Sequence, residues 1–192
     1  MFDKYNLPLE CQMSDGTILK IRNKCDYRMV LDCILALNDN DLTDEEKGKC
    51  ALIIFYENYQ DITDPQEAIN DLIKIVSYDD EEPQKESTKP ALMDWHKDFK
   101  QLAPPISRIL GYDVRLPDKY THWWTFVGGY MEIGECTFAT VVSIRSKKSK
   151  GIKLEKWEEE FCRENPEMIT LPTKYSKEEE ELFSLFEQKG EI

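Results

Sequence analysis

Histidine is scarce in this sequence, and the patterns that build catalytic or metal sites are missing. Among 192 residues there are only His96 and His122, and neither has a partner at a metal-ligand spacing such as H-E-x-x-H. Asp94 and Asp98 flank His96, but charges at i and i+4 of a helix usually form a solvated face. The sequence has no serine elbow, no phosphate loop and no cysteine partnered with a histidine. We therefore expect no catalytic, cofactor-binding or metal-binding residues, and a protein that is not an enzyme.

The sequence also lacks a basic excess and long apolar runs. The chain has 25 basic and 38 acidic residues, a net charge of −13, so it repels phosphate backbones and anionic membranes at long range. Its longest apolar run, residues 51–56, is far shorter than the roughly 20 residues of a membrane span. The opening residues do not resemble a signal peptide. We expect a soluble intracellular protein that binds neither nucleic acid nor membrane.

Six cysteines are present, none of them in a C-x-x-C pair. Five lie within apolar or mixed helical patterns, where cysteine usually acts as a small buried hydrophobic residue in a reducing compartment. We expect free thiols.

Hydrophobic periodicity predicts a mainly α, bundle-like fold with a short β-hairpin at residues 5–22. Helices are expected from residue 26, from 44 to 57 after the capping box of Thr43 and Glu46, and from Asp64-Pro65. Residues 1–78 would form this hairpin and an acidic helical subdomain, and the proline-containing stretch 79–90 a linker.

Residues 91–171 predict a second, aromatic-rich helical subdomain. The first helical pattern ends at Gly111, and Pro104-Pro105 makes it either one kinked helix or two short ones. Further patterns cover residues 120–131 with Gly134 as a C-cap, a helix capped by Thr137, and one that stops at Asn165-Pro166. Gly128-Gly129 would allow close helix packing. Residues 172–192 are expected to form an acidic tail, with a last amphipathic segment from residue 176.

Charge is unevenly distributed along the chain. Residues 38–82 hold 14 acidic and 3 basic residues, whereas residues 145–156 hold six basic residues and one glutamate. The basic stretch is interpreted either as a solvated helix end or as a docking patch for an acidic partner segment. The adjacent Trp123 and Trp124 point about 100° apart on a helix, so one should anchor the core and the other lie nearer an edge. The candidate partner-binding residues are Trp123, Trp124, Arg145, Lys147, Lys148 and Lys150.

Four sequence blocks carry a resemblance to a known family. They are MDWHKDF at 93–99, RILGYDVR at 108–115, THWWTFVGGYMEIGECTF at 121–138 and VSIRSKKSKGIKLEKWEEEFCREN at 142–165. With the N-terminal hairpin and the segment DLTDEEK, the chain resembles the bacteriophage gene product fifteen family over residues 5–171. Pro104-Pro105 and the acidic extension 174–192 depart from that pattern.

The resemblance implies a product of phage or prophage tail-morphogenesis genes, acting in the host bacterial cytoplasm. It suggests a chaperone-like protein that binds the tape-measure or tail-tube protein, and it provides no catalytic residues. An alternative is an acidic inhibitor that mimics DNA and binds a host nucleic-acid-binding protein. Surface acids at duplex-like spacing would favour the inhibitor, and an apolar groove would favour the chaperone.

Overall fold

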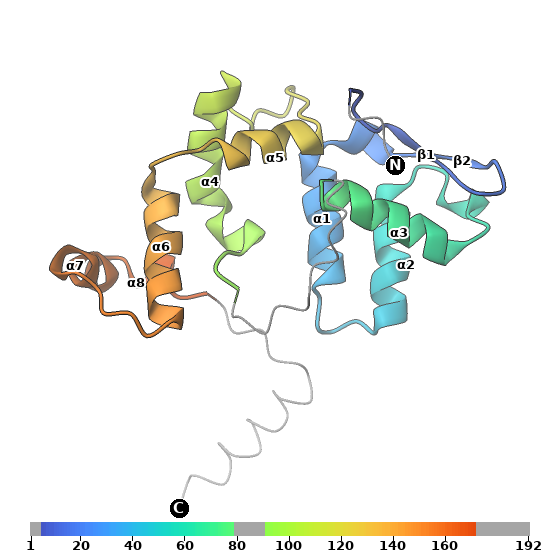
Figure 1. Ribbon diagram of the computed structural model, residues 1–192. Coiled ribbons are helices and arrows are strands. Elements are labelled where there is room, and N and C mark those ends of the chain that lie inside the picture. The colour runs from blue at the N-terminus through green and yellow to red at the C-terminus, as the bar shows by residue number, and fades with distance from the viewer. Residues whose placement is uncertain (1–4, 79–90, 172–192) are drawn as a thin grey trace, which may run out of the picture.

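The computed structural model describes residues 5–78 and 91–171 and shows a mostly helical protein with one small hairpin (Figure 1). The predicted fold class is confirmed. The elements are β1 (Glu10–Gln12), β2 (Ile18–Lys20), α1 (Tyr27–Leu37), α2 (Asp44–Phe55), α3 (Pro65–Val76), α4 (Trp95–Leu110), α5 (Trp123–Met131), α6 (Thr137–Ser149), α7 (Lys156–Glu164) and α8 (Pro166–Ile169), with 3-10 turns at Arg22–Cys25 and Tyr59–Asp61.

The N-terminal elements form as their local signals predict. Strands β1 and β2 pair antiparallel with Cys11 opposite Leu19, both buried. Thr43 and Glu46 close the capping box that begins α2. Asp64 caps α3 through the backbone N–H groups of its first turn. These caps satisfy amides that have no partner inside a helix, which fixes where the two helices start.

Several predicted helix boundaries in the second half are wrong. The helix expected from residue 120 begins at Trp123, because His122 takes the N-cap position. It ends at Met131 with Glu132 as its C-cap, not Gly134. Thr137 is the first residue of α6 and not its cap; Cys136 holds that position without a side-chain hydrogen bond.

Helix α4 is continuous from Trp95 to Leu110 with both prolines inside it, so the two-helix alternative is wrong. It ends at Gly111 in the left-handed conformation, as predicted. Gly129 lies where an added Cβ would be 3.2 Å from Ile106, which confirms close packing there; Gly128 faces open space. Helix α7 ends just before Asn165-Pro166, as expected, and Pro166 is then the first residue of the short helix α8.

One buried core crosses both halves of the sequence. It extends from the hairpin through α1, α2 and α3 to α4, α5 and the start of α6. Tyr27 of α1 stacks on Phe126 of α5 with ring centroids 4.2 Å apart. A second small cluster joins Val141 and Ile144 of α6 to Ile169 of α8. The predicted linker 79–90 and the predicted C-terminal segment 172–192 lie outside the described residues, and the subdomain boundaries stay a prediction.

Candidate partner-binding site

An apolar groove runs between α1 and α4. Leu31 and Leu35 of α1 line it together with Trp95 and Phe99 of α4. The two residues of each pair are four positions apart in the sequence, so each helix presents two apolar side chains on one face. The groove encloses about 350 Å³, and the side chain of Leu35 is 43% exposed. This site is called the α1–α4 groove below.

Charged and polar side chains form the rim of the groove. They are Arg28 and Asp32 of α1, His96 of α4, and Arg115 from the segment after α4. Arg115 is paired with Asp113 at 2.7 Å, while half of its side chain remains exposed. Asp32 is exposed on the α1 side of the rim.

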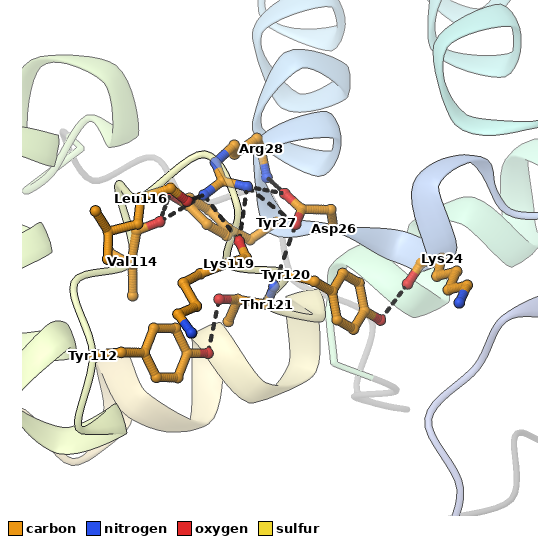
Figure 2. A network of polar contacts seen from close by, with 10 residues as sticks. All are labelled: Lys24, Asp26, Tyr27, Arg28, Tyr112, Val114, Leu116, Lys119, Tyr120 and Thr121. Atoms are coloured by element: carbon orange, nitrogen blue, oxygen red, sulfur yellow. Dashed lines mark hydrogen bonds and ion pairs between the residues drawn. The ribbon is translucent and has the colours of Figure 1, made fainter.

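A polar network holds the groove wall in place (Figure 2). Arg28 donates to the carbonyls of Val114, Leu116 and Lys119, and its guanidinium lies 3.3 Å from a carboxylate oxygen of Asp26. The Tyr27 hydroxyl also donates to the Val114 carbonyl, at 2.9 Å. These bonds link the start of α1 to the segment between α4 and α5, so the groove wall is preorganised.

The two adjacent tryptophans take different positions, as predicted. Trp123 is buried in the core and its indole N–H donates to the Val76 carbonyl at 3.0 Å. Trp124 is half-buried, donates to the Ile75 carbonyl, and meets Tyr78 edge-on. Both indoles therefore connect α5 to the end of α3. A role for Trp124 in partner binding stays a prediction, whereas Trp123 offers a partner no accessible surface.

The prediction that Arg145 belongs to a surface docking patch is corrected by the structure. Arg145 is 5% exposed and pairs with the fully buried Asp98 of α4 at 2.6 and 2.9 Å. It also donates to the carbonyls of Leu92, Met168 and Ile169. Its guanidinium has all of its donors directed inward, so it holds α4, α6 and α8 together.

The remaining basic candidates have different environments. Lys147 is bonded at 2.6 Å to Glu158, whose carboxylate is almost fully buried. Lys148 and Lys150 are exposed at the end of α6 and make no side-chain bond within the part of the chain that the structure describes. Only these two of the four basic candidates remain free at the surface.

Asp98 was assigned to a solvated face, and this prediction is wrong. Asp94 caps α4 through the Lys97 amide, and Asp98 accepts the Asp94 amide while pairing with Arg145. The groove itself was also missed. The apolar spacing at Leu31, Leu35, Trp95 and Phe99 would predict two faces, but only the tertiary arrangement shows that these faces meet with space between them.

His122 has a structural role that fixes its protonation. Its Nδ1 accepts the Trp124 amide and its Nε2 lies 3.0 Å from the Pro8 carbonyl oxygen, which can only accept. The ring is therefore neutral with its proton on Nε2. Burial lowers the pKa of His122, while the Pro8 bond and the charge of Asp26 act in the opposite direction.

A family model described as Bacteriophage Gp15 protein matches residues 9–171. The chain belongs to this family. Membership identifies a phage protein related to phage structure or assembly. No curated protein and no solved structure matches the chain. Within residues 5–78 and 91–171, no helix is long and apolar enough to cross a membrane.

Proposed function

We propose that the protein is a non-catalytic tail-assembly chaperone of the host cytoplasm, which binds an apolar helix of a phage tail protein in the α1–α4 groove. The client would be the tape-measure or tail-tube protein. The observation that carries the proposal is the groove itself. Two facing pairs of apolar side chains, each at i and i+4, are the surface onto which an amphipathic helix packs.

The charges of the groove specify the client further. Asp32 offers an exposed carboxylate on the α1 wall, and Arg115, which is paired with Asp113, has half of its side chain exposed at the rim. A suitable client helix therefore has an apolar stripe with a basic residue beside Asp32. Such a helix would aggregate when unpartnered, and the chaperone's net charge of −13 would keep the complex in solution.

Three buried cysteines are suited to packing and not to nucleophilic chemistry. Burial raises the pKa of Cys11 to about 11, and those of Cys25 and Cys33 to about 12. Such thiols are protonated at neutral pH and are poor nucleophiles. Across residues 5–78 and 91–171, no group of three or more His, Cys, Asp or Glu side chains is arranged to hold a metal ion.

The net negative charge suggested a DNA mimic, but several of the carboxylates have local structural roles. Glu46 and Asp64 cap helices, and Asp71 pairs with Lys74. Glu67 accepts two bonds from Ser14 of the hairpin turn. Carboxylates engaged in this way have positions set by helix starts and turns, and a duplex-like spacing is not needed to explain them. We therefore favour the chaperone.

The groove can be tested with a matched pair of variants. Leu35→Glu places a charge in the groove, and Ile73→Glu places one on α3, where Ile73 is 50% exposed outside the groove. The full chain is co-expressed with the tape-measure or tail-tube protein of the same phage, and the soluble client is measured. Wild type and Ile73→Glu should retain the client, and Leu35→Glu should lose it. Equal retention by both variants would reject the groove as the binding site.

A further inference from the structure

The C-terminal residues 172–192 lie beyond both the described residues and the matched family region. Their sequence contains four consecutive glutamates, 178–181, followed directly by the segment LFSLF at residues 182–186. Four of these five residues are large and apolar. Burying them against an apolar surface releases them from water, which favours a docked position.

The described chain ends beside the first turn of α4, one of the two helices that line the α1–α4 groove. Lys97 of α4 donates to the carbonyl of Thr170, and Leu171 lines a shallow depression together with Ala91 and Leu92, just before α4. The chain therefore leaves the described structure beside the first turn of α4, which carries the groove residue Trp95. Ten residues, 172–181, span up to about 33 Å when extended. This exceeds the length of α4, about 24 Å for 16 residues.

The groove and the segment have complementary chemistry. The groove offers the apolar side chains of α1 and α4 to the apolar residues of the segment. At its rim Arg28 is engaged by Asp26, and Arg115 is paired with Asp113 but keeps half of its side chain exposed. Glu178–Glu181 directly precede the apolar residues, so docking of 182–186 would bring these glutamates to the rim.

We propose that residues 182–186 occupy the α1–α4 groove of their own chain and thereby compete with a client helix. A tethered segment has an effective concentration in the millimolar range, so weak apolar contacts are sufficient for docking. The evidence for docking is the apolar groove and the length of the chain that can reach it. Its role in regulation rests on the proposed function. A client would displace the segment, so the groove is covered until a client arrives.

Photo-crosslinking in the full chain tests the docking. Benzoylphenylalanine replaces Phe183, the dilute protein is irradiated, and crosslinked peptides are mapped by mass spectrometry. Crosslinks should form within one chain, to residues 27–35 or 95–99. Adding Leu35→Glu should lower their yield by roughly fivefold or more, because a charge is disfavoured in an apolar groove. Adding Ile73→Glu should leave the yield unchanged.

Other results would overturn the proposal. Crosslinks to other surfaces, crosslinks only between chains, no crosslinks at all, or equal yields in the two glutamate variants would each show that the segment does not occupy its own groove. If crosslinks map to the groove as expected and no client binds there in the co-expression experiment, the docking is supported and the proposed function is rejected. The two failures are thus distinguishable.

Discussion

Removing Arg145 should destabilise the protein far more than removing any exposed lysine of the same helix. The Arg145–Asp98 pair is almost completely buried, with N–O distances of 2.6 and 2.9 Å. Arg145→Met would leave a buried carboxylate without its cation and would remove the donor from three backbone carbonyls. Breaking a buried pair in this way costs about 3–5 kcal/mol, and the unpaired carbonyls favour the upper part of that range.

Urea unfolding followed by circular dichroism measures the loss. Lys148→Met, on the same helix but exposed, is the control and should change the free energy of unfolding by less than about 0.5 kcal/mol. The double variant Arg145→Met with Asp98→Leu should lose clearly less than the sum of the single losses, because it leaves no uncompensated charge. A loss below about 1 kcal/mol for Arg145→Met would refute this account of the pair.

Three further predictions follow from buried or strained residues. Trp123→Ala should cost about 3–5 kcal/mol in urea unfolding, and Trp124→Ala should cost much less because its ring is only half-buried. Equal large losses would show that both side chains are wholly structural. The pKa of His122 is lowered in the folded state, so stability should fall as pH drops below about 6.5, the unfolded value. His122→Asn, which can still cap α5, should flatten that dependence. An unchanged pH profile in this variant would show that His122 does not cause the loss of stability. Lys24 has φ 54°, so Lys24→Gly should raise stability by about 0.5–1 kcal/mol; a loss would show that the turn is unstrained.

Local chemistry in the sequence was sufficient to predict much of the fold. The Thr43–Glu46 capping box, Asp64-Pro65 and Gly111 each mark a helix end through bonds within a few residues, and all three are confirmed. The predicted start of α5 was wrong because contacts with residues distant in the sequence determine where this helix begins. His122 contacts the Pro8 carbonyl, and Tyr120 donates to the Lys24 carbonyl, which keeps residue 120 outside the helix.

The interior polar contacts could not be predicted from local patterns. Asp98 and Arg145 are 47 residues apart. Asp98 lies at i+4 from another charge, and Arg145 begins a basic stretch; both patterns normally indicate solvent exposure. The left-handed conformation at Asn23, Lys24 and Cys25 had no glycine to signal it. The groove depends on how two distant helix faces approach each other, which sequence periodicity does not determine.

The most direct test of the central claim is deletion of this gene from the phage genome. Without the protein, host cells should accumulate filled heads and few or no normal tails in electron micrographs, and infectious titre should collapse. Wild-type protein and the Ile73→Glu variant supplied in trans should restore tails, and Leu35→Glu should not. Normal, infectious tails from the deletion phage would contradict the chaperone account.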